Sequence, residues 1–164
     1  MNAKIYFTEF TSPIGQLQLR GTELALTGVF MEKHRHEPAR PTDALRDAAP
    51  LREAQRALEE YFAAERREFS LALAPAGTPF QLRVWEALRA IPYGATISYR
   101  ELARRIGNPR AVRAVGLANG RNPLSIIVPC HRVIGANGTL TGYGGGLERK
   151  RFLLALESGA VGGR

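Results

Sequence analysis

The order of local structural signals along the chain limits its fold more than any other feature of the sequence. Near the N-terminus, short runs of strand-forming residues alternate with turn signals such as Ser12-Pro13-Ile14-Gly15, and they predict strands over residues 4–10, 16–20 and 23–30. After Pro50 the apolar residues recur with helical spacing instead. Strands followed by helices indicate a mixed α/β fold of the α+β class. The face of the first predicted helix is formed by Leu51, Ala54, Leu58, Tyr61 and Phe62.

A linker, Pro75-Ala76-Gly77, divides the chain into two predicted domains. Residues 1–77 are expected to form a small N-terminal α/β support domain with an antiparallel three-stranded sheet and a helix, and residues 78–164 a mainly helical C-terminal domain. The second domain opens with a helix whose capping box is Thr78 and Gln81, with Pro79 at its first position. Trp85 lies on the apolar face of that helix and is expected in the core.

Two further helix starts lie close together in the C-terminal segment. Ser98 and Glu101 form a second capping box, and Gly107 closes the short helix that follows. Asn108 is expected to cap another helix, with Pro109 at its first position, that ends near residue 120. Two short helices joined by such a turn predict a helix-turn-helix of winged-helix-like type. The small residues of the second helix would allow close approach either to a neighbouring helix or to a DNA groove.

The net charge of +8 lies entirely in the second half of the chain. Residues 1–77 hold 10 basic and 11 acidic side chains, whereas residues 78–164 hold 13 basic and 4 acidic ones. No acidic residue occurs from Leu102 to Leu147, and every basic side chain in that stretch except the histidine is an arginine. An acid-free, arginine-rich stretch favours contact with a polyanion over a merely solvated surface. No apolar run is long enough to span a membrane, so we expect no membrane partner.

Cys130 is the only cysteine, and it follows a short apolar stretch, residues 126–128, that predicts a strand. A lone cysteine is usually an inert buried residue. Here its neighbours are His131 and Arg132, with a glycine-rich loop downstream, and this context predicts an accessible thiol of lowered pKa. Since no disulfide can form within the chain, we expect a cytoplasmic protein. His131 is either a core residue or a general base, and contact with the thiol would require a bend after Pro129 or a bridging water.

The glycine-rich loop, residues 142–146, leads into a helix predicted from Leu147 to Glu157. A loop of this composition suits a backbone that packs closely against a flat ligand. His34 and His36 flank Arg35, but the sequence offers no further ligand to complete a metal site, so we expect neither a metal nor another cofactor.

At these positions the sequence resembles the O6-alkylguanine-DNA alkyltransferases, also called methylated-DNA–protein-cysteine methyltransferases. The resemblance centres on the segment Ile126-Ile127-Val128-Pro129-Cys130-His131-Arg132-Val133-Ile134 and extends from Phe80 to Glu157. Its further motifs include Ile91-Pro92-Tyr93-Gly94, residues 107–116, Asn122-Pro123 and residues 140–146. The first segment resembles the family's variable N-terminal domain only in outline.

The resemblance implies catalytic roles. Cys130 would accept the alkyl group, and His131 would act as a base through water, oriented by Glu157. Asn122 would hold the turn that leads to the cysteine, and Tyr99 would crowd the neighbouring phosphate and donate a proton to the base.

It also implies a substrate and a partner: O6-alkylguanine, and O4-alkylthymine, in double-stranded DNA bound through its minor groove. Arg113 would enter the duplex in place of the extruded nucleotide, beside Arg110, Ala114 and Arg121. The residues implied in substrate binding are Tyr143, Gly144, Lys150 and Val133. The protein would act once, as a monomer, with cooperative binding along DNA left open.

Two features separate this chain from some relatives. Gly144 stands where many carry serine, so backbone groups would have to serve the guanine there. Alkyltransferase-like proteins carry tryptophan in place of the cysteine, and Cys130 argues against that assignment. The alternative functions are a DNA-binding module without chemistry and a cysteine hydrolase that uses Cys130 and His131. The hydrolase has the weaker support, because no oxyanion hole or third partner is visible.

Overall fold

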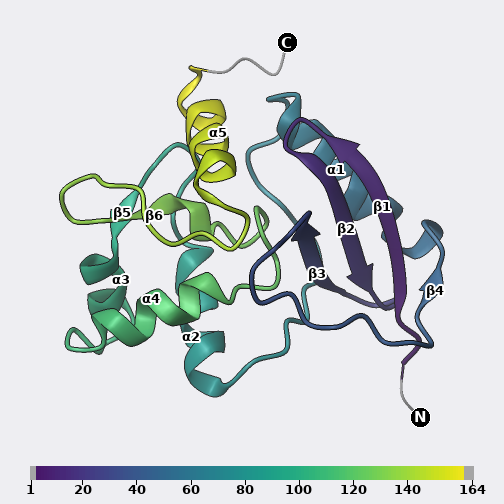
Figure 1. The fold of residues 1–164 in the computed structure, drawn as a ribbon, viewed down its shortest axis with the longest axis horizontal. Helices are drawn as coiled ribbons and strands as arrows, with labels where there is room; N and C mark the ends of the chain where they lie inside the picture. Colours follow the sequence, from purple (N-terminus) through teal and green to yellow (C-terminus); the bar gives the residue numbers. More distant parts are fainter. Residues whose placement is uncertain (1–2, 161–164) are drawn as a thin grey trace.

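The computed structural model describes residues 3–160 and begins with a four-stranded sheet (Figure 1). Strands β1 (Tyr6–Ser12), β2 (Gly15–Gly21) and β3 (Leu26–Met31) form an antiparallel meander, which confirms the three predicted strands. A short strand that the sequence analysis did not predict, β4 (Leu45–Arg46), pairs in parallel with the outer edge of β1. The turn between β1 and β2 forms because Gly15 adopts a φ of +102° and Ser12 Oγ donates to its carbonyl at 2.7 Å.

Helix α1 (Arg52–Phe62) follows a 3-10 turn, Ala49–Leu51, and covers one face of the sheet (Figure 1). Its buried residues include Leu58, Tyr61 and Phe62, which were predicted from their helical spacing. The chain then returns along the edge of the sheet, where Leu73 forms a bridge with Leu26.

Two of the predicted helix starts are confirmed, one fully and one in part. Helix α2 (Pro79–Leu88) has both halves of its capping box, since Thr78 Oγ1 accepts from the Gln81 amide and Gln81 Oε1 accepts from the Thr78 amide. Helix α3 (Tyr99–Arg105) is capped by Ser98 alone. The Glu101 carboxylate that would complete the box pairs with Arg104 and Arg105 instead.

Helix α4 (Val112–Gly120) forms the second half of the helix-turn-helix but begins later than predicted. The expected cap at Asn108 and helical start at Pro109 are wrong. The Ala111 amide donates to the Asn108 carbonyl at 3.0 Å, so these residues close a separate turn before the helix starts. Arg110 therefore lies in the turn between the two helices, while Arg113 lies in the first turn of α4.

The strand predicted over residues 126–128 is also wrong. Ile126 has a φ of +74°, and the amides of Ile127 and Val128 donate to Ser125 and Leu124, so the segment coils on itself. It satisfies its backbone groups through these local turns rather than through a ladder. The segment is joined to the sheet by the bridge between Leu124 and Val29, where the Val29 amide donates to the Pro123 carbonyl at 2.8 Å.

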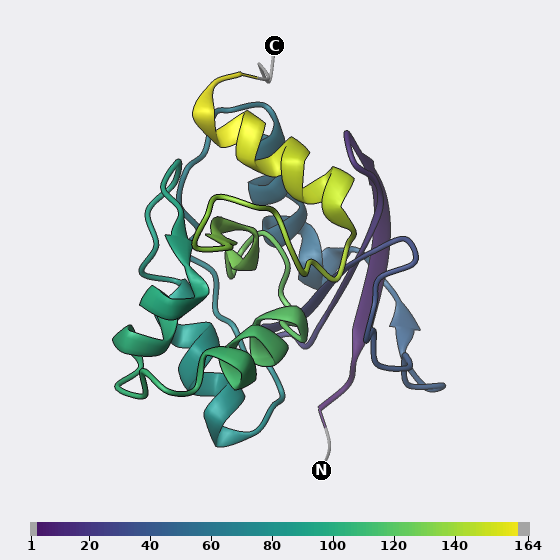
Figure 2. The ribbon, with the colours of Figure 1, turned by 60° about the vertical axis from the view of Figure 1, so that its left-hand side comes forward.

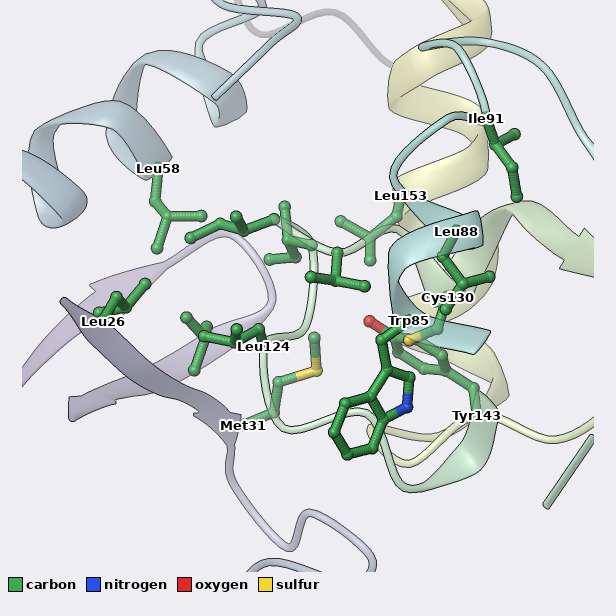
Figure 3. Packing of buried hydrophobic residues seen from close by; sticks show 14 of the residues in the cluster. Leu26, Met31, Leu58, Trp85, Leu88, Ile91, Leu124, Cys130, Tyr143 and Leu153 are labelled. Atoms are coloured by element: carbon green, nitrogen blue, oxygen red, sulfur yellow. The ribbon is translucent and has the colours of Figure 1, made fainter. Parts of the chain in front are cut away.

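The remaining elements close the C-terminal half around Cys130. The strands β5 (Ile97–Ser98) and β6 (Val133–Ile134) pair in parallel, and helix α5 (Leu147–Ser158) ends at Gly159 in the left-handed conformation (Figure 2). One continuous hydrophobic core joins the sheet to the helices, and it extends from Leu26 and Leu58 to Cys130 and Tyr143 (Figure 3). Among the helices described, none has the length and apolar character needed to cross a membrane.

Candidate active site

Cys130 begins a single 3-10 turn, η2 (Cys130–Arg132), instead of ending a strand. Its amide donates to the Val128 carbonyl at 2.8 Å, and its own carbonyl accepts from Asn119 Nδ2 at 3.3 Å. The last turn of α4 is thereby tied directly to the cysteine. The residue is only 4% exposed, so the predicted accessible thiol is wrong for the protein without a ligand.

The predicted lowering of the thiol pKa is wrong as well. Burial raises the pKa of Cys130 to about 11, although a hydrogen bond with Asn122 and the charge of Lys150 act in the opposite direction. Arg132, the nearest cation in sequence, gives its guanidinium to Glu157 and leaves no free charge for the sulfur. The thiol is therefore protonated at neutral pH and needs a base to become a nucleophile.

Glu157 is the centre of the buried polar network behind the cysteine. Its carboxylate accepts from His131 Nε2 at 2.7 Å, from the Tyr61 hydroxyl at 2.6 Å and from the Gly94 amide at 3.2 Å. Arg132 adds a bidentate pair at 2.8 and 2.9 Å. Burial alone would raise the pKa of Glu157, but the hydrogen bonds from His131 and Arg132 outweigh it and hold the pKa well below its usual range. The carboxylate is therefore ionised.

His131 is fully buried, and burial lowers its pKa even though Glu157 acts in the opposite direction. A neutral ring beside an ionised carboxylate places its proton on Nε2, which donates to Glu157. Nδ1 is then the basic nitrogen, and within residues 3–160 it has no hydrogen-bond partner. This arrangement suits a general base held in one tautomer.

Sequence reasoning missed two members of this network. Tyr61 was assigned to the apolar face of α1, and Arg132 was counted only as a positive charge beside the thiol. Tyr61 is 96 residues from Glu157 in sequence, and nothing in helical spacing distinguishes a core tyrosine from one that donates to a buried carboxylate. Only the fold brings the two together.

Asn122 lies in the turn that leads to the cysteine. Its Nδ2 donates to the Val128 carbonyl at 2.7 Å and its Oδ1 accepts from the Leu124 amide at 3.0 Å. The side chain therefore replaces backbone pairing within the coiled segment that stands where a strand was predicted.

Lys150 and Tyr99 converge on the start of the glycine-rich loop. Lys150 Nζ donates to the carbonyls of Val133 at 2.6 Å and Thr141 at 2.8 Å, and the Tyr99 hydroxyl donates to Thr141 at 2.9 Å. Burial lowers the pKa of Lys150 to about 8, although a negative charge on Cys130 acts in the opposite direction. Burial raises the pKa of Tyr99. The two side chains hold the loop close to the cysteine turn.

Tyr143 and Gly144, the two loop residues expected to cover the substrate, lie between Gly142 and Gly146. Tyr143 is buried in the same core cluster as Cys130, and its hydroxyl has no hydrogen-bond partner within residues 3–160. The Gly144 carbonyl accepts from the Arg35 amide at 2.8 Å. A Cβ at Gly144 would lie 2.8 Å from His34 Nε2, so a serine there would require the His34 ring to shift.

The helix-turn-helix presents an exposed basic face. Arg110, Arg113, Ala114 and Arg121 are all exposed, and none of the three arginines forms an ion pair with any described residue. Gly116 lies against the Tyr99 ring, where a Cβ would be 3.8 Å from the nearest ring carbon, so one small residue of α4 serves helix packing. In the described part of the chain, no group of three or more His, Cys, Asp or Glu side chains could hold a metal ion.

Comparison with known proteins places this site in a family. The DNA-binding domain of 6-O-methylguanine DNA methyltransferase matches residues 79–159, and its ribonuclease-like domain matches residues 5–75. The methylated-DNA–protein-cysteine methyltransferase of Methanosarcina acetivorans is 54% identical over 93% of this chain and 98% of its own length. That of Mycobacterium tuberculosis is also 54% identical, over 93% of this chain and 92% of its own.

Solved structures agree with the sequence matches. The crystal structure of Mycobacterium tuberculosis OGT in complex with DNA superposes with a TM-score of 0.90 at 50% identity, covering 96% of this chain and 95% of that one. An O6-methylguanine DNA methyltransferase from Methanococcus jannaschii gives a TM-score of 0.65 at 25% identity, with 92% of each chain covered. The chain therefore belongs to the 6-O-methylguanine DNA methyltransferase family.

Proposed function

We propose that this protein repairs DNA by direct reversal, moving the alkyl group of O6-alkylguanine irreversibly onto Cys130. The observation that carries the proposal is a single buried thiol followed in the chain by a neutral histidine, whose hydrogen-bond partner Glu157 is ionised. Such a pair can generate a thiolate on demand. The family relationship supports the same reaction, since the relatives are named for transfer to a protein cysteine. By the same chemistry, O4-alkylthymine would be a second substrate.

The burial of Cys130 requires that the damaged base leave the duplex. Guanine O6 lies inside the base stack, and extrusion costs a few kcal/mol. Arg113, exposed on the first turn of α4, would fill the space in the stack, and Ala114 beside it leaves room for a close approach to the minor groove. Arg110 and Arg121 would contact phosphates. The DNA complex of the M. tuberculosis relative supports DNA as the partner.

The chemistry follows from the positions of the protons. His131 Nδ1 would take the proton of the Cys130 thiol through a water molecule, and Glu157 would stabilise the imidazolium. The sulfur attacks the alkyl carbon, so that a C–S bond forms as the C–O6 bond breaks. The departing guanine anion gains the Tyr99 hydroxyl proton, and the tyrosine regains one from solvent. A thioether is no leaving group, so each molecule would act once.

The substrate would lie beneath the glycine-rich loop. Tyr143 and the backbone of Gly144 would cover the guanine, while Lys150 holds the Val133 carbonyl beside it and offers positive charge to the thiolate. Asn122 would keep the cysteine turn in place.

We infer a cytoplasmic protein, because a free thiol needs a reducing compartment. We also propose that it is a monomer. The division into a support domain, residues 1–77, and a DNA-binding domain, residues 78–164, stays a prediction. Sedimentation of the protein alone and with a long duplex would test the monomer and show whether copies bind cooperatively.

A turnover experiment separates this function from its alternatives. The protein is mixed with a tenfold molar excess of a duplex that carries O6-methylguanine. Loss of methyl from DNA should stop at one per protein molecule. Continued loss would indicate a hydrolytic enzyme, and tight binding without loss would indicate a lesion sensor. Cys130→Ser should bind the duplex and remove no methyl.

A further inference from the structure

The loop that follows β3, residues 32–36, contacts the glycine-rich loop of the active site. Figure 1 shows the chain leaving β3 and turning toward the helical half before it returns to β4. The Arg35 amide donates to the Gly144 carbonyl at 2.8 Å, so a residue of the N-terminal half is bonded to the predicted substrate cover.

His34 lies at the centre of this contact, where two interactions orient its ring. Its Nδ1 accepts from the Met31 amide at 3.2 Å, and its ring packs edge-on against Phe30 with 5.5 Å between centroids. Burial, together with the charges of Arg149 and His36, lowers the pKa of His34 to about 4, so the ring is neutral and able to accept at neutral pH. Lys33 and His36 adopt positive φ values on either side of it.

The ring of His34 lies directly against the backbone of Gly144. A Cβ built there would approach Nε2 to 2.8 Å and Cδ2 to 3.2 Å, and the imidazole is fixed at its other nitrogen. The ring therefore cannot move aside without losing the Met31 bond. A side chain at this position would therefore require the His34 ring or the loop itself to shift.

Arg149 forms a second connection between the same two loops. Its Nη1 donates to the Glu32 carbonyl at 2.7 Å and to the Gly145 carbonyl at 3.1 Å, while its Nε donates to Ile14 at 3.0 Å. A Cβ at Gly145 would in turn collide with the Met31 sulfur. The β3 loop and the glycine-rich loop are thus in contact at two consecutive glycines, Gly144 and Gly145.

We propose that His34 is a positioning residue for alkyl transfer, which fixes the height of Gly144 over the substrate and so limits the size of the alkyl group accepted. The inference rests on the proposed function, since it assigns the glycine-rich loop to the substrate. It gives the N-terminal half a part in the reaction beyond support of the fold.

Six proteins test the contact: the wild type, Gly144→Ala, His34→Asn, His36→Asn, and the two double variants that combine Gly144→Ala with each histidine substitution. Asparagine can keep an acceptor near the position of Nδ1 for the Met31 amide but removes the ring above Gly144. Methyl transfer is followed under single-turnover conditions at saturating O6-methylguanine duplex, and the Kd for undamaged duplex is measured beside it. Residue 36 supplies the matched control, because His36→Asn changes an exposed histidine of the same loop.

Gly144→Ala should slow transfer about tenfold in the wild type and about tenfold in the control background, His36→Asn. In the His34→Asn background the same substitution should slow transfer by less than about twofold. The coupling is a factor of at least about five, which corresponds to at least about 1 kcal/mol. The Kd for undamaged duplex should stay within about twofold throughout, as expected if only the substrate cover moves. Equal losses in all backgrounds would overturn the positioning role.

His34→Asn alone gives a second test that does not depend on the folding of Gly144→Ala. With the ring removed, the ratio of the rates with O6-benzylguanine and O6-methylguanine duplexes should rise by about tenfold. An unchanged ratio would overturn the size limit. A wild-type protein that transfers no methyl group would contradict the proposed function, and the positioning role with it. Equal losses in all backgrounds, or an unchanged ratio of rates, would contradict the positioning role alone, because the wild type would still be active.

Discussion

Cys130 shows how far a residue's surroundings can depart from its neighbours in sequence. A histidine and an arginine next to a cysteine suggest a reactive thiol, yet both side chains are directed to Glu157 and the sulfur is buried among apolar groups. The free protein therefore protects its nucleophile, and reactivity depends on a base and on the arrival of the substrate.

The thiol should react slowly with iodoacetamide in the absence of DNA. Because burial raises the pKa of Cys130 to about 11, the thiolate fraction grows with pH. The second-order rate should increase about tenfold per pH unit between pH 7 and pH 10, as expected for a thiol titrating above that range. Mass spectrometry of the carbamidomethylated protein measures it, and a rate that levels off below pH 8 would show a thiol of lowered pKa.

Glu157→Gln should slow methyl transfer about a hundredfold, since His131 loses the charge that stabilises its protonated form. It should also lower the free energy of unfolding by about 3 kcal/mol, because the buried Arg132 loses its counter-charge. Affinity for DNA should change little. Single-turnover rates and urea unfolding report the two effects.

Tyr61→Phe is the matched control for that variant. It removes one hydrogen bond to Glu157 but leaves both ion-paired groups, so it should cost about 2 kcal/mol of stability and much less of the rate. A transfer rate unchanged in Glu157→Gln would remove Glu157 from the mechanism.

Arg113→Ala should slow repair of duplex DNA by at least about tenfold more than repair of the same lesion in a single strand. Only in a duplex does the extruded nucleotide leave a gap in the base stack for the arginine to fill. Arg104→Ala is the control, because Arg104 lies in the same acid-free stretch but is paired with Glu101. Equal losses on both substrates would argue against the insertion of Arg113.

The elements that could be predicted from sequence are those whose signals are local. The meander, α1 and the capping box of α2 depend on turns, apolar spacing and side-chain caps within a few residues. The strand over residues 126–128 and the start of α4 at Pro109 failed because neighbouring turns, not propensity, decide the backbone there. Cys130, His131 and Glu157 were placed together by resemblance, while Tyr61, Arg132 and the His34 contact needed the fold.

The helix cap offers a simple test of that local reasoning. Thr78→Ala should lower the free energy of unfolding by about 1 kcal/mol, because the Gln81 amide loses its acceptor. Urea denaturation measures the change. Methyl transfer should be unaffected, since α2 contributes its apolar face to the core and no side chain to the site.

The half of the molecule that contains the sheet has a net charge close to zero, whereas the helical half has a positive net charge. Both halves share one hydrophobic core. This asymmetry of charge predicts binding to DNA that weakens with salt. The double variant Arg110→Ala, Arg121→Ala should lower the slope of log Kd against log salt by about 2, if each arginine neutralises one phosphate. An unchanged slope would place the DNA on another face.

The most direct test is the mass of the protein after reaction with an equal amount of O6-methylguanine duplex, followed by peptide mapping. The structure predicts one added methyl group per molecule, carried by the peptide that contains Cys130, and no further increase with more DNA. An unchanged mass despite tight binding of the lesion, or a methyl group on any other residue, would contradict alkyl transfer to Cys130.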